Sequence, residues 1–227
     1  MGNAKRIRAQ RQSITLRSAT VRHLATKKLT RDPIERLQAA VIAIGDAYDT
    51  DADCASAAAL LREAGRLMGY VLEPRAVSAI IRDDKSGDIL VMGPKARERI
   101  TPKVLARVEN HLPNGKDNGH IVLTSEDPRA LFDPNLRQTG AYGIEAPSVV
   151  MNIQSTHPDS GQWVLQHGDL EVVYILDEEN CVLLDAMERA APHLAADART
   201  LVENLRDGVS IETLRLQSAA ARVRRTS

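Results

Sequence analysis

Cys54 is one of only two cysteines in the 227-residue chain, and its position makes it a candidate nucleophile. It follows Asp53 at the head of an alanine-rich stretch with helical periodicity, which places it in the first turn of a predicted helix. Unpaired backbone N–H groups and the positive end of the helix dipole favour a thiolate there. A lone cysteine at the edge of such a helix is also commonly a small buried hydrophobic residue, so Cys54 alone does not establish a reaction.

A histidine and an aspartate on a predicted hairpin supply the groups that would activate this thiol. His120 opens one strand-like segment, Asp133 ends the next, and the polar turn between them has its midpoint near residues 126–127. Opposed residues of an antiparallel pair have a constant index sum, so this midpoint pairs His120 with Asp133. A carboxylate beside an imidazole fixes its tautomer and stabilises the imidazolium that forms when the ring takes the thiol proton. We therefore predict a Cys54, His120 and Asp133 triad, provided that the N-terminus of the Cys54 helix packs against this hairpin.

Four short segments form an ordered set along the chain. They are Asp53-Cys54-Ala55-Ser56-Ala57-Ala58-Ala59-Leu60-Leu61, Leu67-Met68-Gly69-Tyr70, Gly119-His120-Ile121-Val122-Leu123 and Leu131-Phe132-Asp133-Pro134-Asn135-Leu136-Arg137-Gln138. Together they resemble the transglutaminase-like branch of the papain-like cysteine enzymes, over about residues 50–176. In that family a helix-borne Cys precedes small residues, a Gly-His opens a strand, and a neighbouring strand ends in Asp-Pro, followed by Gln.

The resemblance implies a role for each of these side chains. Cys54 is the nucleophile, His120 the general base and then the general acid, and Asp133 the residue that orients the ring. The implied reaction is acyl transfer, or hydrolysis of a peptide or protein amide, through a thioester and without a cofactor. The backbone N–H of Cys54 and the side chain of Gln138 are the nominated oxyanion donors. Water and an amine both remain open as the acceptor.

This chain also departs from the family pattern. No tryptophan lies near the Cys54 segment, whereas classical transglutaminases have one beside the nucleophile. Asp51 and Asp53 add negative charge that would disfavour a thiolate, or they cap the helix while an imidazolium supplies the compensating charge. Both outcomes are compatible with the sequence.

The remaining patterns predict the elements that must position these residues. Helices are expected over residues 33–44, 54–68, 183–189, 194–205 and 211–223, with a short one after Thr101-Pro102. Strands are expected over residues 70–81, 88–92, 120–124, 130–133, 148–153, 163–166 and 169–176. No long helix separates these strands, so we expect antiparallel pairing. The order predicts an α+β fold, with helices packed on an antiparallel sheet and further helices at the C-terminus.

Charge divides the chain into regions. Residues 1–31 hold nine Lys or Arg and no acid, whereas residues 32–213 hold 17 basic and 30 acidic side chains, a formal charge of −13. We expect residues 1–31 to be a basic, flexible arm, residues 32–176 a transglutaminase-like core, and residues 177–227 a helical extension. The arm is compatible with loose contact to the acidic body, with nucleic-acid or anionic-surface binding, and with a transit peptide. An alternative function is therefore a non-catalytic binding module that engages nucleic acid or an acidic protein through its basic ends.

Composition and motifs exclude other classes. Hydrophobic residues make up 43% and charged residues 26%, which is typical of a globular protein, and six aromatics are too few for a single-strand stacking platform. Cys181 is expected to be structural, Trp163 and Tyr174 to be core residues, and His167-Gly168-Asp169 to be a turn rather than a second base and acid. Neither a metal-ligand spacing nor a nucleotide motif occurs. No apolar run reaches the roughly 20 residues of a membrane span, and we expect a cytoplasmic protein. The sequence does not indicate the oligomeric state.

Overall fold

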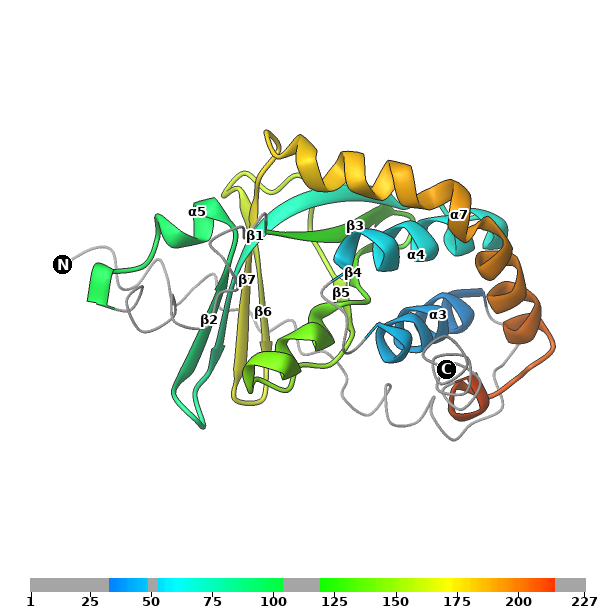
Figure 1. Cartoon of the computed structure of the whole chain (residues 1–227), viewed down its shortest axis with the longest axis horizontal. Helices are drawn as coiled ribbons and strands as arrows, with labels where there is room; N and C mark the ends of the chain where they lie inside the picture. Colours follow the sequence, from blue (N-terminus) through cyan, green and yellow to red (C-terminus); the bar gives the residue numbers. More distant parts are fainter. Residues whose placement is uncertain (1–32, 49–52, 104–118, 215–227) are drawn as a thin grey trace, which may run out of the picture.

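The computed structural model describes residues 33–48, 53–103 and 119–214. The predicted basic arm, Asp51, most of the short helix expected after Thr101-Pro102, and the end of the last predicted helix lie outside these residues. Within the described part, a bent antiparallel sheet lies beside a layer of helices (Figure 1). The predicted α+β class is confirmed.

Seven strands form the sheet, and every pairing is antiparallel, as predicted. They are β1 (Glu73–Asp83), β2 (Asp88–Met92), β3 (His120–Glu126), β4 (Arg129–Asp133), β5 (Val149–Asn152), β6 (Gln162–His167) and β7 (Leu170–Leu176). The order is β5-β4-β3-β1-β7-β6, with β2 also paired to β1. The long strand β1 therefore pairs with both β3 and β7 and joins the two halves of the sheet.

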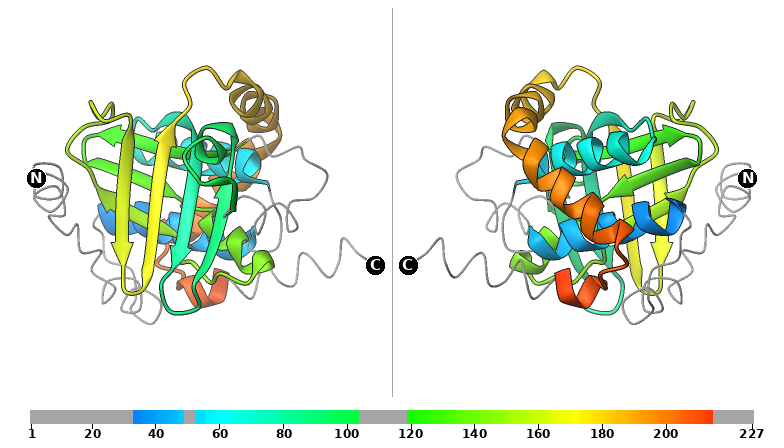
Figure 2. Two further views of the ribbon diagram at one scale, coloured as in Figure 1. Left: turned by 90° about the vertical axis from the view of Figure 1, so that its left-hand side faces the viewer. Right: turned by 90° about the vertical axis from the view of Figure 1, so that its right-hand side faces the viewer.

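Helices α3 (Pro33–Ala47), α4 (Cys54–Met68) and α7 (Cys181–Arg206) cover one face of this sheet (Figure 2). The buried face of α4 is rich in alanine, and these small side chains let the helix pack closely on its neighbours. Ile121 and Leu123 of β3 and Phe132 of β4 point into the same hydrophobic cluster as the helices. As predicted, Gly69 ends α4 in the left-handed conformation, at φ 92°. This packing fixes the start of α4 relative to the β3–β4 hairpin.

The opposite face of β3 and β4 belongs to a second hydrophobic cluster, which the bent sheet encloses. Trp163 of β6 and Tyr174 of β7 lie in this cluster, so both predicted core residues are buried. The 3-10 helix η3 (Leu136–Tyr142) covers part of it and buries Leu136 there. The sequence did not predict η3 or the short helix α5 (Pro94–Arg97).

A single 26-residue helix, α7, replaces the two helices predicted over residues 183–189 and 194–205. The prediction of a break was wrong because Pro192 lies inside α7 without ending it. A proline within a helix removes one hydrogen bond and usually bends the helix, and Figure 1 shows that α7 is bent. Packing against α4, including a paired contact of Arg62 with Glu188 at 2.5 and 2.9 Å, accompanies the unbroken helix.

β3 and β4 form the predicted hairpin, but in a different register. The observed pairs are Leu123 with Phe132, Thr124 with Leu131, Ser125 with Ala130 and Glu126 with Arg129. The direct pairing of His120 with Asp133 was therefore wrong, because this register, if continued, would place residue 133 opposite residue 122. The turn is centred one residue later than predicted and includes Pro128, whose fixed φ suits a turn. His120 and Asp133 still face the same side of the sheet, as diagonal neighbours whose side chains can meet.

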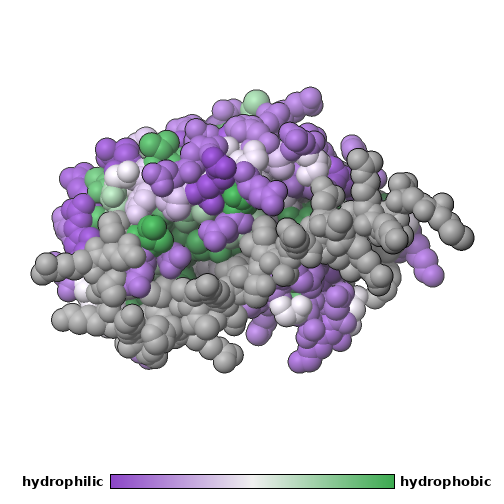
Figure 3. All heavy atoms as spheres, turned by 180° about the vertical axis from the view of Figure 1, so that it is seen from behind, coloured by the Kyte–Doolittle hydropathy of each residue, from purple (hydrophilic) through white to green (hydrophobic). Residues whose placement is uncertain are grey.

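Much of the surface visible in Figure 3 is hydrophilic, and hydrophobic side chains gather near the centre of this face. Large hydrophobic residues with substantial exposure in the described part are Ile34, Val71, Val164 and Val182. Among the described residues, every helix is too short or too polar to cross a lipid bilayer.

Candidate active site

Cys54 is the first residue of α4 and is 7% exposed. Asp53 is the N-cap of this helix, and its Oδ1 accepts a hydrogen bond of 2.9 Å from the backbone N of Ser56. Of the two outcomes left open for Asp53 by the sequence, the structure thus shows the cap. The thiol lies at the end of the helix where backbone N–H groups concentrate positive potential.

His120 begins β3 and is fully buried. The preceding Gly119 has φ 91°, a value that L side chains rarely adopt, and a Cβ there would lie 2.6 Å from the carbonyl oxygen of Val77 on β1. Only glycine allows the chain to approach β1 this closely and turn into the strand. The conformation of Gly119 is therefore needed for structural reasons, because it lets the chain turn into β3 and places the His120 imidazole on a buried face of the sheet.

Asp133 ends β4 and is also fully buried, and three donors satisfy its carboxylate. Oδ2 lies 2.8 Å from Nε2 of His120 and accepts a 2.9 Å hydrogen bond from the Tyr174 hydroxyl. Oδ1 accepts a 3.0 Å hydrogen bond from the backbone N of Asn135. These hydrogen bonds hold the carboxylate against the ring.

The charge and hydrogen-bonding capacity of the Cys54 side chain act on the same imidazole, which places the thiol near the His120–Asp133 pair. Burial by itself lowers the pKa of His120. The charge of Asp133, its hydrogen bond, and the hydrogen bond and charge of Cys54 oppose burial and raise that pKa to about 10. The arrangement therefore favours a protonated ring between a carboxylate and a sulfur atom.

Two carboxamide side chains complete the buried site. With its amide oriented to satisfy both neighbours, Asn135 accepts a 3.1 Å hydrogen bond from the backbone N of Cys54 and donates a 3.0 Å bond to the carbonyl oxygen of Tyr48. Gln138 of η3 is 6% exposed, and its Nε2 lies 3.0 Å from Nδ1 of His120. Both nominated oxyanion donors thus lie at the site, and both already have partners within the protein.

Asn135 and Tyr174 are the site residues that the sequence reasoning missed. Asn135 lies between Asp133 and Gln138 in the quoted motif, but nothing in the sequence showed that its side chain would reach the first residue of α4. Tyr174 was recognised only as a core residue. Its register position opposite Ala79, two residues from the partner of His120 on β1, would have indicated the shared face. That signal required knowledge of the strand order.

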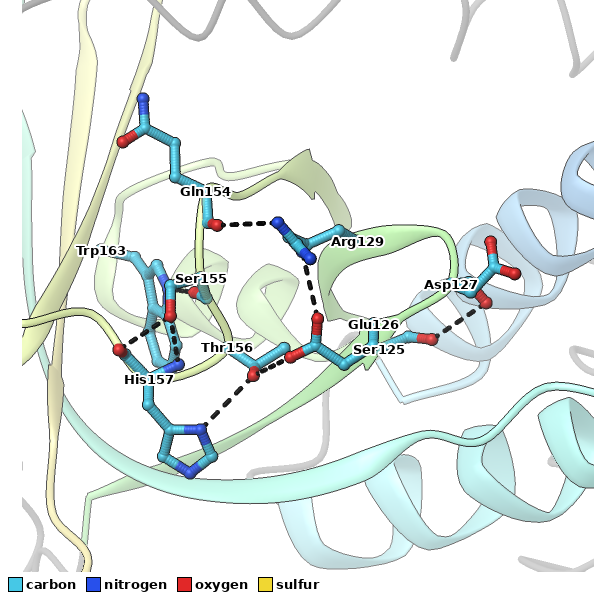
Figure 4. Close-up of polar contacts among 9 residues, drawn as sticks. All are labelled: Ser125, Glu126, Asp127, Arg129, Gln154, Ser155, Thr156, His157 and Trp163. Atoms are coloured by element: carbon cyan, nitrogen blue, oxygen red, sulfur yellow. Dashed lines mark hydrogen bonds and ion pairs between the residues drawn. The ribbon is translucent and has the colours of Figure 1, made fainter.

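A second polar cluster lies at the turn of the same hairpin (Figure 4). The Thr156 hydroxyl donates to Oε1 of Glu126 at 2.5 Å and lies 3.4 Å from Nδ1 of His157, while Arg129 Nε donates to Oε2 of Glu126 at 3.1 Å. The Thr156 hydrogen bond, opposed by slight desolvation and supported by Arg129, lowers the pKa of Glu126. Because Glu126, Arg129 and His157 are exposed, we interpret this cluster as a link between the hairpin and the following loop.

The other chemical candidates lie elsewhere. Cys181, expected to be structural, is exposed at the start of α7. His167 pairs with Leu170 across the β6–β7 hairpin, which confirms the predicted turn at residues 168–169. In the parts of the chain that the structure describes, His, Cys, Asp and Glu side chains form no group of three suited to a metal ion.

Comparison with known proteins finds no match, either among protein-family models, among curated proteins or among solved structures. The site must therefore be interpreted from its own geometry.

Proposed function

We propose that this protein is a cysteine enzyme of transglutaminase-like type that transfers an acyl group, or hydrolyses an amide, through a thioester on Cys54. The observation that carries the proposal is the buried 2.8 Å contact of His120 Nε2 with Asp133, on a ring that also interacts with Cys54. A histidine that contacts a carboxylate and lies near a thiol is the arrangement needed to activate a sulfur nucleophile.

The proposed reaction proceeds in two halves. The Cys54 thiol gives its proton to His120, which forms the imidazolium that this site favours, and the sulfur attacks the carbonyl carbon of a peptide or protein amide to form a tetrahedral adduct. Cleavage of the C–N bond follows as the imidazolium protonates the departing amine, leaving the acyl group on sulfur. Water or a second amine then gives a proton to His120 and attacks the thioester, which releases the acid or a new amide and restores the thiol.

The contacts of the His120 ring give each of its two nitrogens a role in this scheme. Nε2 faces Asp133, so Nδ1 is the nitrogen left to exchange a proton with Cys54. Gln138 also contacts Nδ1, and its carboxamide can turn to present oxygen when the ring is protonated. We propose that Gln138 follows the protonation of His120 in this way.

The oxyanion that develops during attack needs donors of its own. The backbone N–H of Cys54 is suitably placed on the nucleophile itself, but it is bonded to Asn135 in this structure. We infer that the substrate carbonyl oxygen replaces Oδ1 of Asn135 when it binds.

Both cysteines are free thiols, which agrees with the proposed cytoplasmic location and its reducing conditions.

The proposal is tested with p-nitrophenyl acetate, a small activated acyl donor, on the full chain carrying Cys181→Ser. This background removes the exposed thiol and leaves Cys54 as the single cysteine. We expect a burst of p-nitrophenolate and, by mass spectrometry of the digested protein, one acetyl group on the peptide that contains Cys54. The burst should disappear in the Cys54→Ser variant.

The matched control compares the native chain with the same chain in denaturant, where Cys54 has lost its partners. Faster acetylation of Cys54 in the native chain supports the proposal. A native rate no higher than that of the denatured thiol would show that the site does not activate sulfur, and the proposed function would be abandoned.

A further inference from the structure

The Tyr174 hydroxyl donates its hydrogen bond to Asp133, at the same carboxylate oxygen that contacts His120. Its oxygen lies 2.9 Å from Oδ2 of Asp133, and that same Oδ2 lies 2.8 Å from Nε2 of His120. Tyr174 is fully buried on β7, which pairs with β1 and lies on the other side of β1 from β3. The phenol thus bridges two halves of the sheet to reach the carboxylate.

We propose that Tyr174 is a positioning residue of this site that shares Oδ2 of Asp133 with His120 and thereby weakens the hold of Asp133 on the imidazolium proton. This inference rests on the proposed function for its catalytic meaning, although the hydrogen bond itself can be tested without any reaction. Two donors on one carboxylate oxygen compete for its charge, so each bond is weaker than it would be alone.

The competition has a direct consequence for the proton on the ring. A donor on Asp133 stabilises the state in which the carboxylate is charged and the ring is neutral, because that state leaves the negative charge uncompensated by the imidazolium. Without the Tyr174 hydroxyl, Asp133 would hold the His120 proton more strongly. A ring that holds its proton too strongly is a weaker acid toward the leaving amine, and it is neutral for a smaller fraction of the time, so it is less available as the base for the second half of the reaction.

The titratable groups that face this proton come from three elements. Cys54 approaches His120 from the start of α4, Asp133 from the end of β4, and Tyr174 acts through Asp133 from β7. Desolvation by burial, together with the charge of Asp133, raises the pKa of Tyr174 well above its ordinary value. The phenol therefore stays a donor throughout the pH range in which His120 titrates.

The test is proton and nitrogen NMR of the full chain with labelled histidine, comparing wild type with Tyr174→Phe. In the variant, Oδ2 serves one donor, so we expect the His120 Nε2–H resonance to move downfield. We also expect the pH at which the ring loses its proton to rise by about one unit. The same shift should appear in the pH dependence of deacetylation of acetyl-Cys54 after the p-nitrophenyl acetate burst.

Tyr142→Phe is the matched control. Tyr142 packs against the same hydrophobic cluster from η3, and its replacement leaves the three donors of Asp133 in place, so the His120 resonance should not move. Incorporation of 3-fluorotyrosine at position 174 provides a second variant that keeps the side-chain shape. Its more acidic hydroxyl is a stronger donor and should move the His120 resonance upfield, the direction opposite to Tyr174→Phe.

An unchanged His120 resonance in both Tyr174 variants would overturn the inference. So would a loss of stability in Tyr174→Phe without any movement of the resonance, because that outcome describes packing alone. The NMR measurement needs no substrate, so a failed acetylation experiment with a responsive His120 resonance would reject the proposed function and retain the role of Tyr174.

Discussion

The β3–β4 hairpin carries a histidine cluster at each end, and the two clusters differ in their solvent exposure. At the open end, His120 and Asp133 are fully buried and make a 2.8 Å contact. Near the turn, exposed His157 is linked through the Thr156 hydroxyl to exposed Glu126. Both ends combine an imidazole, a carboxylate and a hydroxyl, yet only the buried end includes a thiol.

The difference in solvent exposure explains why similar groups affect pKa values differently in the two clusters. In the buried cluster the charge of Asp133 acts through a low-dielectric interior, and with Cys54 it raises the pKa of His120 to about 10 against the opposing effect of burial. At the exposed cluster, water screens the charges, and the lowered pKa of Glu126 reflects local hydrogen bonds from Thr156 and Arg129. The comparison indicates that residue types alone do not identify a reactive site.

The largest expected difference between the clusters is chemical. His120→Gln in the Cys181→Ser background should slow acetylation of Cys54 by p-nitrophenyl acetate at least about 100-fold, because the sulfur loses its base. His157→Gln should leave the rate unchanged, since that ring contacts Thr156 in the other cluster. Equal rates in both variants would mean that the burial of His120 has no bearing on the thiol.

The next difference concerns stability. Asp133→Ala removes the partner of a buried ring and leaves the Tyr174 hydroxyl and the Asn135 N–H unpaired, so it should lower the free energy of unfolding by about 3 kcal/mol. Glu126→Ala removes an exposed carboxylate and should change the unfolding midpoint little. Urea unfolding measures the free energy of unfolding of both variants. A larger loss of this free energy in Glu126→Ala than in Asp133→Ala would contradict the prediction.

A rise in pH should remove the stabilising contribution of the buried cluster, whereas a fall in pH should remove that of the exposed cluster. The pKa of His120 is raised in the folded protein from its ordinary value of 6.5 to about 10. Its stabilising contribution is therefore complete below pH 6.5 and is lost as the pH rises toward 10. The pKa of Glu126 is lowered, so its smaller contribution is present above its ordinary value of 4.5 and is lost as the pH falls.

Variants at each cluster can separate the alkaline loss of stability from the acid loss. Relative to wild type, His120→Gln should flatten the decline in unfolding free energy between pH 6.5 and 10, whereas Glu126→Gln should leave that decline intact and affect only the acid side. If the unfolding free energy of His120→Gln still declines between pH 6.5 and 10 as it does in the wild type, the decline comes from other groups.

Much of the fold followed from local patterns in the sequence. Hydrophobic periodicity and caps predicted α4 with its end at Gly69, and the run of strands without long helices predicted the antiparallel sheet. The unbroken α7 was missed, because local helix propensity at Pro192 does not include the packing of α7 on α4. The hairpin register was missed because it depends on where one turn is centred.

The site was predictable only in part for a related reason. Cys54, His120 and Asp133 carry side chains whose chemistry is recognisable, and they lie in short ordered segments. Asn135 and Tyr174 act through hydrogen bonds that depend on tertiary placement. Tyr174 in particular reaches Asp133 across β1, and a strand order that places β1 between β3 and β7 cannot be derived from the periodicity of any one strand.

The smallest expected effect tests whether the two clusters communicate along the hairpin. Thr156→Val removes the hydroxyl that joins Glu126 to His157, and it should lower the unfolding free energy by about 1 kcal/mol with no change in Cys54 acetylation. Combined with Asp133→Ala, its effect on stability should be additive, because the two clusters share no partner. A double variant that deviates from additivity, or a Thr156→Val chain with altered acetylation, would show that β3 and β4 transmit strain between their ends. The exposed cluster would then belong to the site rather than serve as its structural counterpart.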